Sequence, residues 1–337
     1  MYANVRGMKS KITNLATILN ECKPEVFLLT ETQLRSNVGV HIAGYSFHGR
    51  KREGGIGGGV GILVRDDVKQ NVFLHSSTRD IELMWLSVQR AKKSPIIIGT
   101  YYGKQLSRTS KQEIQREMNL LEEEITEMKN DGEILICMDG NAKLNLLGEG
   151  FCRNGKLLKQ VFERTGLSMI NGSSKCEGKL TRMNTKDENE VSAIDFVLAS
   201  QTVEKWISKV VIDEDGLYKI KGKIDSDHNT ILIKIRIPNI KKFKVKKTTV
   251  WNLRAPSEKW ADFSDQLRQN CEWAASQISD SSIPLETRYN NWYRGVEQMA
   301  RQTIGKTTLK ATRDIKPTDE MKLLQQRKKS PKRRNTE

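Results

Sequence analysis

Residues that can act as acids, bases or metal ligands stand at the ends of several apolar segments. Glu31 ends the run VFLLTE, Asp139 directly follows ILICM, and Asp195 directly precedes FVL. A carboxylate is costly inside a buried strand, but it is natural at the strand's end, where several strands can deliver side chains to one site. The complete set, in chain order, is Asn4, Glu31, Tyr101, Asp139, Asn141, Asp195 and Ser226-Asp227-His228. This mixture of carboxylates, amides and an imidazole indicates acid–base or metal-assisted chemistry.

The tripeptide Ser226-Asp227-His228 contains the three residue types of a serine hydrolase, but it cannot form a catalytic triad by itself. Neighbouring residues of an extended chain point to opposite faces, so they cannot fold onto one another. The chain also lacks the Gly-x-Ser-x-Gly turn of many such hydrolases. His228 therefore needs a distant partner, and Asp195 is the candidate that would orient its imidazole.

The segments that must position these residues alternate between strand-like and helix-like patterns. Apolar runs predict strands at 26–30, 60–65, 83–89, 96–102, 134–138, 194–198, 207–212 and 230–237. Apolar residues at helical spacing predict helices at 9–21 and 110–129, and a helix followed by a strand within 155–171. Many strands with a few helices between them indicate an α/β (α+β) fold, a layered sandwich.

Composition narrows the class of protein. The net charge is +16, and residues 238–337 hold 22 basic and 11 acidic side chains, so this third carries most of the positive excess. Such a surface attracts polyanions, because each neutralised phosphate releases condensed counterions. Five scattered cysteines, an odd number without a Cys-x-x-Cys pair, argue against a disulfide framework and a zinc site. The short apolar runs and the N-terminus MYANVRGMKSK argue against a membrane span and a secretory signal.

The composition changes at Pro238. We expect a catalytic domain at 1–237, a basic linker at 238–250, a helical connector at 251–315 and a basic tail at 316–337. Within the connector, residues 257–279 and 285–305 have helical patterns. The glycine-rich segment 54–61 lacks the Gly-Lys-Ser/Thr of a phosphate-binding loop and is interpreted as a loop beside the site.

The ordered polar set resembles the endonuclease/exonuclease/phosphatase family over residues 1–237. The phrases NVRGM, PEVFLLTET, MDGNAK, NGKLLKQVFERTGLSMING and SAIDFVL are similar to the endonuclease domain of non-LTR (LINE-type) retrotransposons. The resemblance implies a four-layered α/β sandwich of two packed β-sheets with outer helices, followed here by a helical and basic extension. The Trp-containing connector resembles the segment that precedes a reverse transcriptase in such polyproteins. No reverse-transcriptase box occurs in the chain, so we expect a fragment, a truncated copy or a domesticated relative.

The resemblance also implies a role for each residue. Glu31 matches the principal ligand of Mg²⁺, with Mn²⁺ as the alternative, and Asn4 and Asp227 match residues that complete the metal surroundings. Asp139 matches the residue that orients or deprotonates the attacking water, and His228 matches the histidine that binds the phosphate. The remaining matches are Asp195 as partner of that histidine, Asn141 and Tyr101 as phosphate contacts with Tyr102 as the substitute, and Ser226 as a supporting hydrogen-bond donor.

Two positions depart from the family pattern. Arg6 stands where repair-type members often carry a further acidic ligand, which favours the retroelement interpretation. Arg182 follows Leu180-Thr181 where retroelement relatives commonly carry an aromatic residue, and it is a candidate contact to a backbone phosphate.

We therefore expect an enzyme that hydrolyses phosphodiester bonds and nicks double-stranded DNA, with nuclear access and no small-molecule cofactor. Abasic-site repair, and hydrolysis of RNA or a phosphoinositide, use the same catalytic set and remain alternatives. A domesticated or decayed copy that only binds DNA is the non-enzymatic alternative.

Overall fold

Two β-sheets form the centre of the N-terminal part of the chain. The computed structural model describes residues 1–35, 40–52, 57–75, 77, 79–105, 107, 109–184, 190–240, 249–252, 255–279 and 281–308. It divides into two compact units, Met1–Phe243 and Lys244–Glu337. Most of the expected linker and the whole basic tail at 316–337 lie outside the described residues, as does part of the glycine-rich segment.

The first sheet joins strands from both ends of the N-terminal unit. Its strands, in spatial order, are β10 (Cys176–Glu177), β14 (Ile207–Ile212), β15 (Ile231–Ile235), β1 (Tyr2–Asn4), β2 (Val26–Thr30), β4 (Val60–Arg65) and β3 (Tyr45–Arg50). β1 runs parallel to β2, with Asn4 beside Thr30, and antiparallel to β15. The end of β1, the end of β2 and the start of β15 therefore meet at one edge.

The second sheet is built from the middle of the chain. Its order is β5 (Val72–His75), β6 (Glu82–Arg90), β7 (Lys93–Tyr102), β8 (Glu133–Asp139), β13 (Asp195–Ala199) and β9 (Ser168–Met169). β7 and β8 are parallel, with Tyr102 beside Asp139, and β13 is antiparallel to β8, with Asp195 beside Asp139. These three residues consequently lie in one row at the end of the sheet.

Alternate residues of each strand face either the other sheet or the outer helices, as strand geometry requires. In β7, Ile96 and Ile98 belong to the core between the two sheets, whereas Ile97 and Tyr101 belong to the core beneath the helices. This alternation decides which of two neighbouring side chains reaches a site between the sheets.

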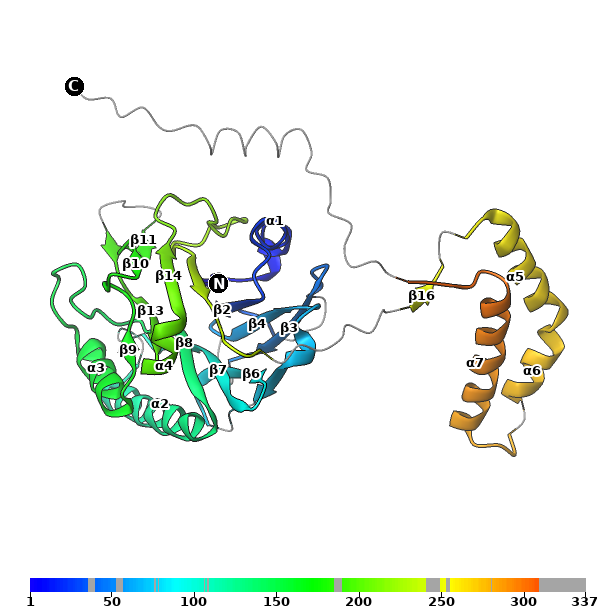
Figure 1. Ribbon diagram of the computed structural model, residues 1–337, viewed down its shortest axis with the longest axis horizontal. Helices are drawn as coiled ribbons and strands as arrows, with labels where there is room; N and C mark the ends of the chain where they lie inside the picture. Colours follow the sequence, from blue (N-terminus) through cyan, green and yellow to red (C-terminus); the bar gives the residue numbers. More distant parts are fainter. Residues whose placement is uncertain are drawn as a thin grey trace, which may run out of the picture. The chain divides into compact units, whose positions relative to one another are not determined.

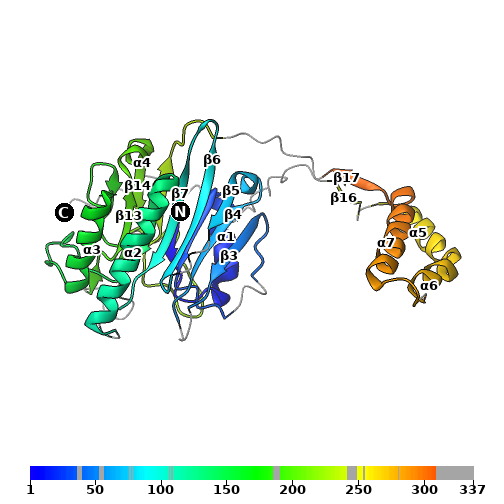
Figure 2. The same ribbon diagram turned by 90° about the horizontal axis from the view of Figure 1, so that it is seen from below.

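Helices cover the outer face of each sheet. α1 (Ile12–Cys22) buries Leu15, Ile18 and Leu19 against the first sheet. α2 (Lys111–Asp131) begins with a capping box between Ser110 and Glu113, and with α3 (Arg153–Thr165) it packs on the second sheet. Figures 1 and 2 show α2 and α3 on the opposite side of the sheets from α1. The layers are helix, sheet, sheet and helix, which confirms the predicted sandwich.

Several predicted strands and helices coincide closely with the observed ones. The strands predicted at 26–30, 60–65 and 207–212 have the observed bounds, and most others differ by a few residues at their ends. The predicted helix at 9–21 is a short 3-10 turn, η1 (Lys9–Lys11), followed by α1. The smaller elements are η2 (Lys69–Asn71), β11 (Arg182–Met183), β12 (Val191–Ser192) and α4 (Gln201–Trp206). None of the helices in the described part of the chain is long and apolar enough for a membrane span.

The C-terminal unit contains three helices and a two-stranded sheet among its described residues. These are α5 (Ser257–Gln269), α6 (Cys271–Ser279), α7 (Leu285–Gln302), β16 (Thr249–Trp251) and β17 (Lys306–Thr308). The predicted helix at 257–279 is thus two helices, separated at Asn270. α6 and α7 approach closely, because Gly295 leaves room for the Trp273 ring where a Cβ would meet it at 1.8 Å. A small core of Ala255, Ala300 and Ile304 lies beside Trp251.

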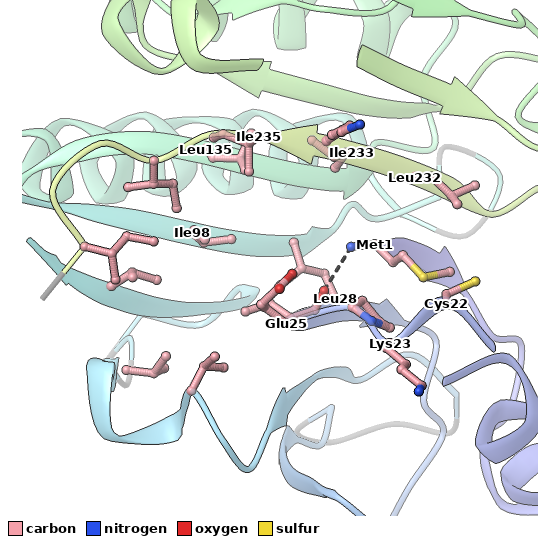
Figure 3. A pocket seen from close by; sticks show the side chains of 18 of the residues that line it. Met1, Cys22, Lys23, Glu25, Leu28, Ile98, Leu135, Leu232, Ile233 and Ile235 are labelled. Atoms are coloured by element: carbon pink, nitrogen blue, oxygen red, sulfur yellow. Dashed lines mark hydrogen bonds between the residues drawn. The ribbon is translucent and has the colours of Figure 1, made fainter. Parts of the chain in front are cut away.

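A cavity of about 700 Å³ opens between the strands of the N-terminal unit (Figure 3). It lies beside Met1, where β1 begins, and is lined by Val26 of β2 and by Ile233 and Ile235 of β15. β1 is too short to separate these strand ends, so they leave an apolar space between them. None of the polar residues predicted for the site lines this cavity, and we assign no chemistry to it.

Glu117 makes the stability of the N-terminal unit depend on pH. Its side chain is buried under α2, accepts a hydrogen bond from the Tyr101 hydroxyl at 2.9 Å, and burial raises its pKa to about 7. The pKa of Glu117 is higher in the folded protein than in the unfolded chain, so the buried carboxyl group contributes its full stabilisation below about pH 4.5. This contribution to the free energy of unfolding is lost as the pH rises through 7. We expect the free energy of unfolding to fall by at most about 3 kcal/mol over this range from this group.

Glu117→Gln should remove this contribution to the fall in the free energy of unfolding. Urea unfolding at pH 5 and pH 8 would measure the difference. Glu123→Gln is the matched control, since its side chain is on the same helix and 60% exposed. Identical pH dependence in Glu117→Gln and the parent would contradict the assignment.

Candidate active site

The predicted polar residues meet at the edge where both sheets end. Asn4 and Glu31 come from β1 and the residue after β2 of the first sheet, and Asp139 and Asp195 come from β8 and β13 of the second. The segment Ser226-Asp227-His228 precedes β15, which is antiparallel to β1, so it reaches the same edge.

Asp195 connects the two sheets at the centre of this site. Its Oδ2 lies 2.8 Å from Nδ1 of His228, and its Oδ1 accepts a hydrogen bond of 2.8 Å from the hydroxyl of Tyr2. Asp195 and Tyr2 are fully buried, and His228 is 5% exposed. The carboxylate therefore fixes the imidazole and leaves Nε2 directed toward Asp139, whose Oδ2 is 3.9 Å away. This is the distant partner that the sequence assigned to His228.

Asn4 holds two carboxylates together on the other side of Asp139. Its Nδ2 donates to Glu31 Oε1 at 3.0 Å and to Asp139 Oδ2 at 2.8 Å. Ligand atoms of Glu31, Asp139 and His228 all lie within 4.8 Å of one another, so these three could hold a metal ion. The hard oxygen donors of the two carboxylates suit Mg²⁺ or Mn²⁺.

Burial and neighbouring charges shift the proton affinities of the site. Burial raises the pKa of Asp139 well above its ordinary value and nearby Asp195 adds to this, while His228 acts in the opposite direction. Burial lowers the pKa of His228, but Asp195 and its hydrogen bond outweigh this and raise the pKa above the ordinary histidine value. The raised pKa favours the protonated imidazole, in which both ring nitrogens are donors.

Tyr101 does not reach the site, and Tyr102 does. The Tyr101 side chain lies beneath the helices, where its hydroxyl donates to Glu117. Tyr102 points between the sheets, in the row of Asp139, and its hydroxyl donates to Glu31 Oε1 at 3.0 Å. The choice of Tyr101 is corrected to Tyr102, because adjacent strand residues face opposite ways and only the even-numbered ones of β7 face the first sheet.

Asp227 is held by two arginines rather than by the carboxylate cluster. Its Oδ1 lies 3.2 Å from Nη1 of Arg6, and its Oδ2 lies 2.9 Å from Nε of Arg182. Burial would raise the pKa of Asp227, but His228, Arg6 and Arg182 together lower it below the usual value. The structure therefore does not bring Asp227 into the group that could hold a metal.

Ser226 and Asn141 make contacts within the protein. The buried Ser226 hydroxyl donates to the Asn4 carbonyl at 2.7 Å and accepts the His228 backbone N–H at 3.2 Å, so it positions these residues rather than facing a substrate. Asn141 donates through Nδ2 to the Gly103 carbonyl at 2.7 Å, and its backbone N–H donates to Asp139 Oδ1 at 2.9 Å. The Asn141 side chain also forms a hydrogen bond with Tyr102, which places it beside the Tyr102 hydroxyl.

Three residues that support Asp195 were missed in the sequence. Tyr2 bridges Asp195 and Thr30, Thr181 accepts the Asp195 backbone N–H at 3.0 Å, and Asn171 donates to the Asp195 carbonyl at 3.1 Å. Tyr2 carried a signal, because it precedes Asn4 by two positions and must share its face of the strand. Thr181 and Asn171 lie in short connecting segments, where the sequence shows no such periodicity.

Comparison with known proteins shows what the chain is similar to. Residues 1–128 match the model of the Endonuclease/Exonuclease/phosphatase family. No curated protein matches the sequence.

Solved structures share the fold. The endonuclease domain of TRAS1, a telomere-specific non-LTR retrotransposon, is 17% identical with a TM-score of 0.51, over 70% of this chain and 96% of its own. AP endonuclease LMAP from Leishmania major is 13% identical with a TM-score of 0.59, over 70% and 87%. The 3′ phosphatase NExo from Neisseria, bound to product DNA hairpin, is 15% identical with a TM-score of 0.56, over 70% and 98%. The chain is therefore similar to the Endonuclease/Exonuclease/phosphatase family over residues 1–128, and it shares its fold with these solved structures.

Proposed function

We propose that the N-terminal unit is a Mg²⁺-dependent endonuclease that nicks one strand of double-stranded DNA, as the endonuclease of a non-LTR retrotransposon does to prime reverse transcription. The observation that carries the proposal is the Asp195–His228 pair beside Asp139, within the same rim as Glu31 and Asn4.

The carboxylate cluster fits a divalent cation. The Asn4 amide nitrogen lies 3.0 Å from Glu31 Oε1 and 2.8 Å from Asp139 Oδ2. Oxygens of both carboxylates therefore converge on one point. Asn4 Oδ1 accepts the Arg6 backbone N–H at 3.0 Å, so Asn4 would offer this oxygen to an ion by rotating its amide and giving up that hydrogen bond. Glu31 and Asn4 would hold the ion beside Asp139, and when bound it would neutralise phosphate charge and stabilise the leaving oxygen.

Hydrolysis of a phosphodiester also needs a positioned base and donors for the phosphate oxygens. Asp139 supplies the base, because its raised pKa makes its carboxylate a stronger proton acceptor for an attacking water. The His228 cation supplies a charged N–H to a phosphate oxygen, and Asp195 compensates its charge from behind. Burial raises the pKa of Tyr102, so its hydroxyl stays protonated and can donate to the phosphate or the leaving group.

The net charge and the resemblance to retrotransposon endonucleases both support DNA as the substrate. The net charge of +16 favours a polyanion over a small phosphate ester. The phrases shared with retrotransposon endonucleases, and Arg6 in place of a further acidic ligand, favour nicking over repair. A DNA substrate implies access to the nucleus. Abasic-site repair is the second candidate, since the AP endonuclease LMAP has a higher TM-score than TRAS1.

Purified full-length chain should convert supercoiled plasmid to open circles with Mg²⁺, and EDTA should abolish the reaction. Asp139→Ala and His228→Ala should each lower the nicking rate by about a hundredfold or more, because they remove a base and a charged donor. Agarose gels measure the conversion. A short duplex with one abasic site, compared with the intact duplex, tests the repair alternative.

Arg164→Ala is the control variant, since the exposed Arg164 lies on α3 and pairs with Glu122 of α2 away from the site. Equal nicking by the parent, Asp139→Ala and His228→Ala would contradict the catalytic assignment. DNA binding without nicking by the parent would support the non-enzymatic alternative.

The two adjacent tyrosines provide a second, internally matched test. Tyr102→Phe should lower the nicking rate by about ten- to a hundredfold with little change in stability, because it removes a donor from the site. Tyr101→Phe should leave the rate unchanged and lower the free energy of unfolding, because it removes the partner of buried Glu117. Nicking rates and urea unfolding of both variants distinguish the roles, and the reverse pattern would restore Tyr101 to the site.

A further inference from the structure

Arg6, Asp227 and Arg182 form a cluster at the rim of the site that the proposed hydrolysis does not use. Each carboxylate oxygen of Asp227 faces one guanidinium, Arg6 at 3.2 Å and Arg182 at 2.9 Å. The Asp227 side chain is 9% exposed, whereas those of Arg6 and Arg182 are 42% and 25% exposed. The Asp227 carboxylate is therefore buried, and the side chains of both arginines reach solvent.

This arrangement leaves Asp227 unsuited to hold a cation. Both of its oxygens already face cationic groups, and a divalent ion would have to displace a guanidinium and then lie beside two positive charges. Glu31 and Asp139, by contrast, both accept from the neutral amide of Asn4 rather than from an arginine.

We propose that Asp227 in this chain is the anchor of a phosphate-binding site, in which Arg6 and Arg182 hold a backbone phosphate of the nucleic acid next to the cleaved bond. The inference rests on the proposed function and adds a second anion site to it. A guanidinium keeps several N–H donors when one or two are used, so both arginines can hold Asp227 and still bind a phosphate.

Backbone contacts fix both arginines relative to the catalytic residues. The Arg6 N–H donates to Asn4 Oδ1 at 3.0 Å, and Lys11 Nζ donates to the Arg6 carbonyl at 2.8 Å. The backbones of Arg182 and His228 pair as an isolated antiparallel β-bridge, and the Met183 N–H donates to the Asp227 carbonyl at 2.8 Å. A phosphate bound here would therefore be placed in fixed register with Asn4 and His228.

The cluster carries surplus positive charge on its outer side. Two guanidiniums that reach solvent share one buried carboxylate. Glu190 also approaches Arg182 Nη1, at 3.3 Å, but its side chain is 58% exposed. An exposed pair of this kind contributes little, so a phosphate diester can replace Glu190 at Arg182.

The experiment measures binding of a short labelled DNA duplex by fluorescence anisotropy in EDTA, where no metal contributes and no cleavage occurs. The dissociation constant is followed across a range of salt concentrations. Arg6→Gln and Arg182→Gln should each weaken binding several-fold and reduce the slope of log affinity against log salt by about 0.9. Arg6→Lys and Arg182→Lys, which keep the charge, should keep the slope, and Arg164→Gln is the control away from the site.

Metal binding separates the two roles of the acidic residues. Asp227→Asn should retain the Mn²⁺ affinity of the parent within about twofold, as measured by electron paramagnetic resonance, while weakening DNA binding. Glu31→Gln should lose Mn²⁺ affinity by about tenfold or more. Thermal unfolding of each variant shows that the fold is kept.

Unchanged salt slopes in the arginine variants, or loss of Mn²⁺ affinity in Asp227→Asn, would overturn the inference. If the parent nicks plasmid but the arginine and Asp227 variants do not give the expected results, the phosphate site is wrong and the proposed function stands. A parent that neither nicks plasmid nor binds the duplex would overturn both.

Discussion

The buried carboxylate of Asp195 is the constraint on which the rest of the site depends. One oxygen is tied to Tyr2 in the first sheet and the other to His228, while its own backbone belongs to the second sheet. A buried carboxylate without partners is expensive, so these contacts must form together if the sheets are to close at this edge. Closure then sets His228 opposite Asp139 and leaves room for Asn4 between Asp139 and Glu31.

Much of this could be predicted from the sequence, because strand ends and apolar alternation are local signals. The runs before Glu31 and Asp139 predicted both the strands and the polar residues at their ends, although the two strands, β2 and β8, belong to different sheets. The choice between Tyr101 and Tyr102 needed the register of two strands that are distant in the sequence. Only that register shows that Tyr102 lies in the row of Asp139.

The rest of the site depends on contacts between segments with no shared pattern. Asp227 precedes His228 directly, and the sequence groups them, yet they face different partners. Arg6 and Arg182 are far apart in the chain, and each reads as a separate departure from the family pattern. Their convergence on one carboxylate could come only from the fold. The two departures therefore form one feature, which replaces acidic metal surroundings with anchored cations.

Asp195 and His228 are expected to act as one unit in hydrolysis, and a double-mutant cycle of the two residues measures their coupling. Plasmid nicking rates would be measured for the parent, Asp195→Asn, His228→Gln and the double variant, with thermal unfolding as a check on folding. If Asp195 acts through His228, the double variant should be no slower than the slower single variant, within about threefold. Rate losses that simply multiply in the double variant would show that the two residues act independently. That result would contradict a role of Asp195 through His228.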